Sequence, residues 1–399
     1  MNRRKFIKQG GAASALILTG TSALADMALR KDKKDIHIGI IGTGQRGTGL
    51  IPFINSIENL KVYACCDTIP FRLQEGLKRT NGKAKGYANY KDLLANRSID
   101  AVLIATPFSM HAQIALDAID AGKHVYCEKT LAKGYQDIHH LIAKVKNANI
   151  IFQTGHQYHS SRLYQHVVNL IEGGKVGQIT AFECQWNRHG DWRRPVPDPS
   201  LERAINWRMY REYSGGLLAE LCSHQIDFVN TILKANPIQV MGTGGVDYWK
   251  DGRETYDNIH VLYSYPNGVT AKFTCLTNNK KDGYQIKVIG DKGTLIITTD
   301  SATFYSEEKK ETKQPLYGDV DGVSGATAPG RSWDYGEPIE ITHEDPSKQA
   351  LMDFRDSIVY GREPISNVVT GAKAAICVQM GLDAMYNNEI VPWNPEHSF

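Results

Sequence analysis

The chain has 399 residues, 42% of them hydrophobic, with 46 basic and 43 acidic side chains and a formal net charge of +3. This length indicates about two domains. The near-balance of charge argues against a nucleic-acid-binding surface and against a long disordered tail.

The first 25 residues are predicted to be an export signal. Arg3 and Arg4 stand side by side, an apolar run from Ala12 to Leu24 follows, and residues 23–25 read Ala-Leu-Ala. This order is typical of a twin-arginine signal peptide, cleaved here after Ala25. The apolar run is too short to span a bilayer. We therefore expect a periplasmic or otherwise exported protein with no membrane contact after cleavage; the alternative is a basic N-terminus with a short core helix.

A glycine-rich turn follows the first apolar strand of the mature chain. Residues 36–41 are mostly β-branched, and Gly42, Gly44 and Gly47 then form a G-x-G-x-x-G pattern. Gly42 allows a tight turn, Gly44 leaves room for a pyrophosphate, and Gly47 lets the next helix pack closely. The N–H groups at the start of that helix would face the phosphates. We expect the cofactor contacts of this turn to come from Gly42, Thr43, Gly44, Gln45, Arg46 and Gly47.

Asp67 ends the second predicted strand, Lys61–Cys66, and lies 20 residues after Gly47. At this spacing a carboxylate accepts hydrogen bonds from the adenosine ribose and repels a 2′-phosphate. The expected cofactor is therefore NAD, with NADP disfavoured, although Arg72 would weaken the preference. The alternative is a surface turn with an aspartate at the strand end.

Residues 34–155 alternate strands with helices, the pattern of a Rossmann domain with a doubly wound parallel sheet. In such sheets ligands bind beyond the carboxyl ends of the strands. Two strand ends there carry further candidates for cofactor binding. They are Thr106, Pro107 and His111 after the strand at 101–105, and Glu128 and Lys129 after the strand at 124–127.

Residues 156–399 change character and predict an α+β domain with a large, mostly antiparallel sheet. Five strands are expected between residues 238 and 298, after one at 179–187, and residues 307–345 are expected to form a surface excursion. Helices at 348–359 and 368–387 close the chain and are expected to pack back on the first domain. The cysteines fall inside apparent strands and helices with no C-x-x-C spacing, so buried free thiols are expected.

Lys129, Glu220 and His224 are the candidate catalytic residues. Glu220 and His224 are four residues apart in a predicted helix at 217–233, so both lie on one face. Hydride removal from a carbinol needs a base for the hydroxyl proton, which histidine supplies near neutral pH, and a lysine ammonium stabilises the developing alkoxide. The competing interpretation is a surface ion pair or a core histidine.

These motifs together resemble the glucose–fructose oxidoreductase/inositol dehydrogenase (Gfo/Idh/MocA) family. The resemblance covers residues 34–393 and rests on the glycine turn, Thr106-Pro107, Glu128-Lys129 and Gly215-Gly216…Glu220…His224. It implies that Lys129 holds the reactive hydroxyl and that His224 accepts its proton. Thr130 replaces the proline of the family's E-K-P motif, which should loosen the turn. Glu220 replaces the usual aspartate, so its carboxylate reaches about one methylene group further.

The resemblance also implies a sugar or cyclic polyol substrate. The loop at 188–194 suits such a ligand, because an aromatic ring can stack on a sugar and polar side chains can bond its hydroxyls; the alternative is an exposed, solvated loop. The candidate substrate-binding residues are His189, Asp191, Trp192, Arg193, Trp207, Arg208 and Tyr213. The H-x-x-H pair at His156 and His159 is a weak metal signal, so no metal is expected and ordinary hydrogen bonding is preferred.

Three functions remain open at this point. The first is an NAD(P)-dependent sugar oxidoreductase with a tightly held cofactor. The second is an NAD-dependent glycoside hydrolase that oxidises C3 transiently, eliminates the glycoside and then restores the hydride. The third is a non-catalytic binding protein, which the Lys129/His224 pair disfavours. A homo-oligomer formed through the C-terminal sheet is expected from the family resemblance.

Overall fold

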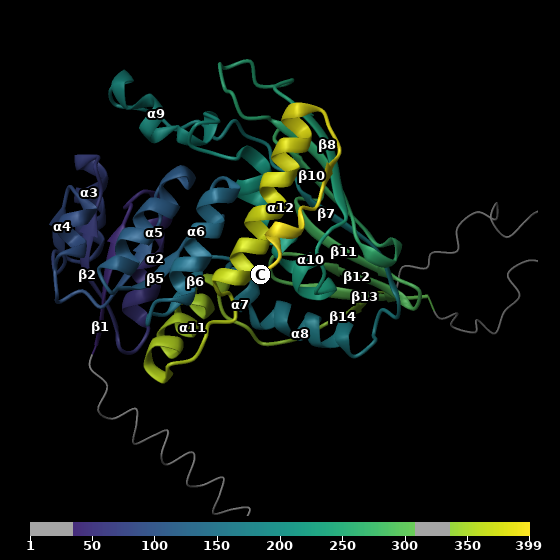
Figure 1. Cartoon of the computed structure of the whole chain (residues 1–399), viewed down its shortest axis with the longest axis horizontal. Helices are drawn as coiled ribbons and strands as arrows, with labels where there is room; N and C mark the ends of the chain where they lie inside the picture. Colours follow the sequence, from purple (N-terminus) through teal and green to yellow (C-terminus); the bar gives the residue numbers. More distant parts are fainter. Residues whose placement is uncertain (1–34, 308–335) are drawn as a thin grey trace, which may run out of the picture.

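The computed structural model describes residues 35–307 and 336–399. Within them a parallel sheet and a larger second sheet stand side by side (Figure 1). The proposed signal peptide at 1–25 and most of the expected excursion at 307–345 lie outside the described residues. Those two interpretations therefore stay predictions.

The first sheet confirms the predicted doubly wound Rossmann architecture. Its order is β3-β2-β1-β4-β5-β6 and every adjacent pair is parallel. The strands are β1 (Ile36–Ile41), β2 (Leu60–Cys66), β3 (Lys85–Tyr87), β4 (Ala101–Ile104), β5 (His124–Cys127) and β6 (Phe152–Thr154). The strands are apolar because helices cover both faces of a parallel sheet. The strand order reverses between β1 and β4, which is where such folds bind ligands.

Two separate hydrophobic cores lie on the two faces of this sheet. Ile36, Ile38 and Ile40 of β1 point to one core and Ile41 to the other, as expected from the period of a strand. The helices of this domain are α2 (Gln45–Ser56), α3 (Pro70–Arg79), α4 (Tyr90–Leu94), η1 (Phe108–Met110), α5 (His111–Asp120) and α6 (Tyr135–Lys146).

The second sheet has nine strands in the order β14-β13-β12-β11-β7-β10-β9-β8-β15, and only β7 and β10 pair in parallel. This confirms the mostly antiparallel sheet that the sequence predicts. Its strands are β7 (Ile179–Trp186), β8 (Gln239–Gly245), β9 (Asn258–Ser264), β10 (Thr270–Leu276), β11 (Tyr284–Gly290), β12 (Gly293–Ile297), β13 (Ala302–Ser306), β14 (Glu337–Pro338) and β15 (Val391–Pro392).

Helices cover one face of this second sheet (Figure 1). Along β11 buried and partly exposed residues alternate, so each strand presents one apolar and one polar face. On the polar face Glu183 pairs with Lys272 at 3.2 Å and with Lys287 at 3.7 Å. The remaining helical elements are α7 (Gln157–Ser160), α8 (Arg162–Glu172), η2 (Pro199–Leu201), α9 (Glu202–Ile205), η3 (Trp207–Met209), η4 (Leu218–Cys222), α10 (Ser223–Leu233), η5 (Pro266–Gly268) and η6 (Pro395–His397).

The last two long helices contact both domains. α11 (Pro346–Tyr360) packs on α2 and α7, and its Leu351 and Phe354 join the core beneath β1. α12 (Val368–Asn387) packs on α6, α10 and β8. α12 is long and apolar enough to cross a membrane, but 72% of its most apolar window is buried in the protein. Burial of this kind is what a core helix shows. All seven cysteines are free and buried, as expected.

Candidate active site

A cleft of about 1230 Å³ lies at the carboxyl ends of β1, β4 and β5, roofed by residues 188–213 and the start of α10. Most of the candidate residues line it. They are Gly42, Gly44, Gln45, Arg46, Asp67, Thr106, Pro107, His111, Glu128, Lys129, Trp192, Trp207, Arg208, Tyr213, Glu220 and His224. Thr43, Gly47, His189, Asp191 and Arg193 do not line the cleft.

The three glycines of the first turn serve three different needs. Gly42 has φ of +93°, and a Cβ there would lie 2.6 Å from the carbonyl oxygen of Ala105. A Cβ on Gly47 would lie 2.0 Å from the carbonyl oxygen of Gly42, so this residue lets α2 pack against the turn. A Cβ on Gly44 would meet no atom nearer than 3.9 Å. Gly44 therefore faces open space at the start of α2, where a pyrophosphate would bind.

Asp67 is held by the backbone on both sides of the turn. Its Oδ2 accepts a hydrogen bond from the Thr43 N–H at 2.9 Å, and its Oδ1 accepts one from the Ile69 N–H at 2.9 Å. The Thr43 hydroxyl also lies 3.3 Å from Oδ2, so it is Oδ1 that keeps a lone pair for another donor. Thr43 is buried and donates its hydroxyl to the carbonyl of Arg72 at 3.0 Å. Thr43 therefore fixes the position of the Asp67 carboxylate through its backbone N–H, while its own hydroxyl is held by the Arg72 carbonyl.

Two of the candidate cofactor-binding side chains are engaged with the protein itself. Arg46 Nε donates to buried Glu128 at 2.6 Å, and its Nη1 donates to Ser347 of α11 at 3.0 Å. The ring nitrogens of His111 lie 2.8 Å from the carbonyl oxygen of Thr130 and 3.1 Å from that of Thr106. These contacts tie the β4 and β5 ends together and leave backbone and glycine surface to face a nucleotide.

Lys129 and Glu220 meet in the floor of the cleft. Lys129 Nζ donates to the carbonyl oxygen of Glu220 at 2.8 Å and lies 4.0 Å from its carboxylate. Arg208 Nε donates to the same carboxylate at 2.8 Å. Burial lowers the pKa of Lys129, against the opposing effect of Glu220. Burial would raise the pKa of Glu220, but Arg208 and Lys129 hold it below its usual value. Glu220 is therefore ionised and balances two cations.

Glu220 lies in a π turn rather than in a continuous α-helix. The helix predicted over 217–233 is present, and η4 is a π-helical segment near its start that continues directly into α10. Such turns often mark functional sites. The Thr130 hydroxyl donates to the Ala219 carbonyl in this turn at 2.9 Å. This hydrogen bond links the residue after Lys129 to η4, and the expectation that Thr130 loosens the turn stays a prediction.

His224 is buried against aromatic rings at the inner end of the cleft. Its ring centroid lies 5.1 Å from that of Tyr158 and 5.8 Å from that of Trp186. Among the described residues its Nδ1 has no hydrogen-bond partner. Burial, and then the charge of Lys129, lower the pKa of His224 well below its usual value. The ring is therefore neutral at neutral pH and able to accept a proton.

A second cavity of about 270 Å³ is also lined by His224. His159 Nδ1 lies 2.9 Å from Asp227 Oδ2 in its wall, which agrees with the ordinary hydrogen bonding expected for His159. His156 differs from that expectation, because neither of its ring nitrogens has a partner among the described residues. No group of three potential metal ligands occurs within residues 35–307 and 336–399.

His156 is expected to make stability fall with acidification. Burial lowers its pKa from 6.5 to about 4, so below pH 6.5 the unfolded chain takes up a proton that the folded chain excludes until about pH 4. Going from pH 7 to pH 5 should cost about 2 kcal/mol of unfolding free energy through this residue. Urea titrations of the wild type and His156→Gln at both pH values measure the difference. The exposed His140→Gln is the control; an equal pH effect in His156→Gln and the wild type would contradict the prediction.

The candidate substrate-binding residues divide into two sets. Trp192, Trp207, Arg208 and Tyr213 face the cleft. His189 instead bonds the carbonyl of Asn278 at 2.9 Å.

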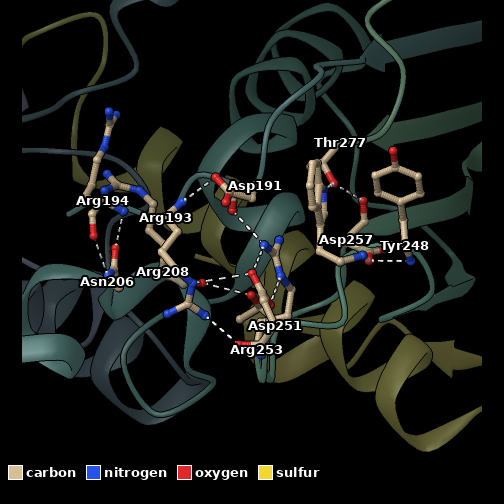
Figure 2. Close-up of polar contacts among 12 residues, drawn as sticks. Asp191, Arg193, Arg194, Asn206, Arg208, Tyr248, Asp251, Arg253, Asp257 and Thr277 are labelled. Atoms are coloured by element: carbon tan, nitrogen blue, oxygen red, sulfur yellow. Dashed lines mark hydrogen bonds and ion pairs between the residues drawn. The ribbon is translucent and has the colours of Figure 1, made fainter. Parts of the chain in front are cut away.

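Figure 2 shows the remaining two predicted loop residues, Asp191 and Arg193, in a network with Asp251 and Arg253. Arg253 Nη2 donates to the Asp191 carbonyl at 2.8 Å and to Asp251 at 2.6 Å. Arg193 lies 3.5 Å from Asp251 and also pairs with Glu202. These contacts shape the loop from outside the cleft.

Two arginines of the loop that were not among the candidates line the cleft. Arg188 lies 5.6 Å from the ring centroid of Trp186 and 5.7 Å from that of Trp192. Arg194 Nη2 donates to Gln45 Oε1 at the start of α2 at 2.7 Å. The high number of arginines in this loop could have indicated an arginine in the cleft. A loop has no periodic pattern, however, so the sequence does not show which of these side chains face inward.

Comparison with known proteins supports both halves of this architecture. A family model described as "Oxidoreductase family, NAD-binding Rossmann fold" matches residues 36–156, and "GFO/IDH/MocA C-terminal domain" matches residues 164–296. Myo-inositol 2-dehydrogenase of Thermotoga maritima is 26% identical over 268 residues, covering 65% of this chain and 74% of that protein. A "glycosyl hydrolase family 109 protein" of Shewanella pealeana is 29% identical over 235 residues, covering 53% of this chain and 50% of that protein.

Solved structures share the fold. The aldose–aldose oxidoreductase of Caulobacter crescentus, complexed with glycerol, superposes with a TM-score of 0.71 and 20% identity, over 90% of this chain and 100% of that one. At this identity the likeness supports the two-domain fold, including the parallel sheet beside the mostly antiparallel one.

Proposed function

Because the chain belongs to the Gfo/Idh/MocA family of NAD(P)-binding oxidoreductases, we propose that it transfers hydride between a nicotinamide cofactor and a sugar, glycoside or cyclic polyol. One observation carries the proposal. Lys129 and His224 line the same cleft that begins at the glycine turn of a dinucleotide-binding sheet. The names of the inositol dehydrogenase and aldose–aldose oxidoreductase relatives agree with a polyhydroxylated substrate.

Each residue of the cleft has a separate role in such a reaction. Bound NAD supplies a hydride acceptor. Lys129 donates a hydrogen bond to the reactive hydroxyl and stabilises the alkoxide as its proton leaves. Neutral His224 takes that proton as the general base. Glu220, fixed by Arg208 and the Lys129 contact, keeps the ammonium in place and balances its charge. Trp192 and Trp207 offer apolar faces to the sugar ring.

A screen of sugars, polyols and aryl glycosides tests the proposal. Each compound is incubated with the purified protein, and both cofactor absorbance and release of the aryl group are followed. We expect a change in cofactor absorbance with at least one class of polyhydroxylated substrate. No change with any of them, from a protein that binds NAD, would contradict the proposed function.

A second candidate is an NAD-dependent glycoside hydrolase. The 29% identity to a glycosyl hydrolase family 109 protein favours it. In that reaction oxidation at C3 acidifies the C2 proton, elimination breaks the glycosidic bond, and water and hydride are added back. Retention of Lys129 in the position of the E-K-P lysine favours the oxidoreductase. Release of the aryl group without net reduction of NAD would identify the hydrolase.

We expect NAD to bind more tightly than NADP. The carboxylate of Asp67 is fixed by Thr43 and Ile69, and it would repel a 2′-phosphate placed at the ribose. Arg72 lies close enough that its charge interacts with Asp67, which moderates the preference. Calorimetric titration of both cofactors measures the ratio, and Asp67→Asn should reduce it. Equal affinities of the wild type for NAD and NADP would contradict the prediction that Asp67 selects against the 2′-phosphate.

We also expect the cofactor to stay bound through the whole catalytic cycle. The reason is the pairing of the predicted twin-arginine signal with a dinucleotide fold, since that route exports folded proteins into a compartment with little free NAD. Hydride taken from one substrate must then return to a second sugar or to the same molecule. Protein purified without added nucleotide should release NAD or NADH on denaturation. An empty protein that needs millimolar NAD would contradict this.

Export to the periplasm and assembly through the second sheet complete the proposal. Among the described residues, helices cover only one face of that sheet, and the other carries the Glu183 ion pairs. A second copy of the chain bound at this face would give a homodimer. Sedimentation equilibrium of the mature protein measures its mass, and a monomer at micromolar concentration would contradict this part of the proposal.

A further inference from the structure

The cleft carries more positive charge than its own carboxylates neutralise. Seven cationic side chains and three carboxylates line it. Two of those carboxylates are already committed, because Glu128 pairs with Arg46 at 2.6 Å and Glu220 is shared by Arg208 and Lys129. Asp67, the third, interacts with Arg72. Arg203 pairs with Glu212 and Glu254, which do not line the cleft.

Arg188 and Arg194 are then left without a carboxylate partner among the described residues. Arg194 donates to Gln45 at the start of α2, so it lies beside the expected pyrophosphate and is explained by the cofactor. Arg188 is not explained in this way. It lies against Trp186 and Trp192, and the Trp186 ring is 5.8 Å from the ring of His224. Arg188 is therefore on the substrate side, one aromatic ring away from the proposed base.

Arg188 is an exposed residue, so solvent screens its charge, and it pairs with no carboxylate among the described residues. Partial burial lowers its pKa, and the charges of Arg208 and Arg194 act in the same direction, while Cys275 and Tyr158 oppose the shift. Arg208 is already paired with Glu220 and Arg194 with Gln45, so Arg188 is the guanidinium whose charge a bound anion would balance. The guanidinium carbon of Arg188 lies within 5.7 Å of both tryptophan ring centroids, and Arg188 lines the cleft, so a carboxylate or a sulfate bound there would be within its reach.

We propose that the substrate is an acidic sugar whose carboxylate or sulfate group is bound by Arg188 beside Trp192. This inference rests on the proposed function and narrows its substrate class. The sugar ring stacks on Trp192, the anionic group pairs with Arg188, and the reactive hydroxyl points toward Lys129 and His224. A neutral sugar in the same cleft would offer Arg188 no charged partner.

The first test is independent of turnover and of the identity of the sugar. Inorganic sulfate is titrated into the NAD-saturated protein while the tryptophan fluorescence is followed, because Trp186 and Trp192 both contact Arg188. We expect a saturable change in the wild type that is lost in Arg188→Gln. Arg97→Gln is the control: Arg97 is exposed and lies ahead of β4, at the opposite end of the sheet from the cleft. A wild type with no saturable change, or an equal loss in Arg97→Gln, overturns the inference.

The second test compares sugars that differ only in charge. Methyl glucosides and galactosides are paired with the corresponding methyl uronides and 6-sulfates, and binding to the NAD-saturated protein is measured by calorimetry. The acidic member of at least one pair should bind about 10- to 100-fold more tightly, as expected for a charge-assisted hydrogen bond. Arg188→Gln should remove that advantage and leave the neutral partner unchanged. Equal or tighter binding of the neutral members overturns the acidic-sugar assignment, while the proposed oxidoreductase function survives.

The same set of sugars distinguishes a carboxylate from a sulfate as the anionic group that Arg188 binds. Preference for the uronides indicates a carboxylate and preference for the 6-sulfates indicates a sulfate, and both support the inference. If sulfate and acidic sugars bind but no compound changes the cofactor absorbance, the anion site stands and the proposed reaction is wrong.

Discussion

Replacing Lys129 with methionine should lower turnover by about 10²-fold or more, and replacing His224 with alanine should have an effect of the same order. Methionine keeps the apolar stem of Lys129 but removes the ammonium that donates to the Glu220 carbonyl. The alkoxide would then form without a cation beside it, and in the His224 variant the hydroxyl proton would have no neutral base. Single-turnover kinetics on the purified variants measure the loss directly.

Lys133→Met is a matched control for the lysine variant. Lys133 lies four residues further along and donates to the carbonyls of Arg211 and Glu212 without lining the cleft. Its variant should keep wild-type turnover. Both active-site variants should keep their cofactor content, because neither side chain forms the glycine turn. Near-normal turnover of Lys129→Met or His224→Ala, in protein that binds NAD, would show that the acid/base assignment is wrong.

The fold was predictable where hydrophobic periodicity is long and regular. β1 and β5 begin and end at the predicted residues, and α12 matches its predicted range of 368–387. Strand β3 (Lys85–Tyr87) was missed because it is three residues long and none of them is fully buried. The two-residue strands β14 and β15 were missed for the same physical reason, since so short a strand leaves no alternating pattern.

The positions of site residues were predictable where a sequence motif determines the backbone. They were not predictable in the loop at 188–194, where tertiary contacts determine which side chains face the cleft. The glycine turn and the ends of β2 and β5 place Gly44, Asp67 and Lys129 around one cleft because parallel strands end at one edge. The loop at 188–194 has no such constraint. Arg193 pairs with Asp251, while Arg194 and Arg188 face the cleft. These directions depend on contacts with residues distant in the sequence, so the local sequence does not reveal them.

The largest expected effect on folding comes from Gly47→Ala. Its Cβ would lie 2.0 Å from the Gly42 carbonyl oxygen, a backbone atom that cannot move aside without displacing β1 from α2. Overpacking of this kind should cost about 3 kcal/mol or more of unfolding free energy and should abolish nucleotide binding. Urea unfolding and NAD calorimetry measure the two effects separately.

Two glycines of the same segment supply the controls. Gly49 lies in α2, and a methyl group added there would have nothing within 4 Å, so Gly49→Ala should raise the unfolding free energy by about 0.5–1 kcal/mol through helix propensity. A Cβ on Gly44 would also be free of protein contacts, with Arg72 Nη1 at 3.9 Å as its nearest neighbour. Gly44→Ala should therefore stay folded yet bind NAD at least about tenfold more weakly, because the methyl group takes the space of the pyrophosphate. If Gly44→Ala bound NAD as tightly as the wild type, the pyrophosphate could not lie at the start of α2.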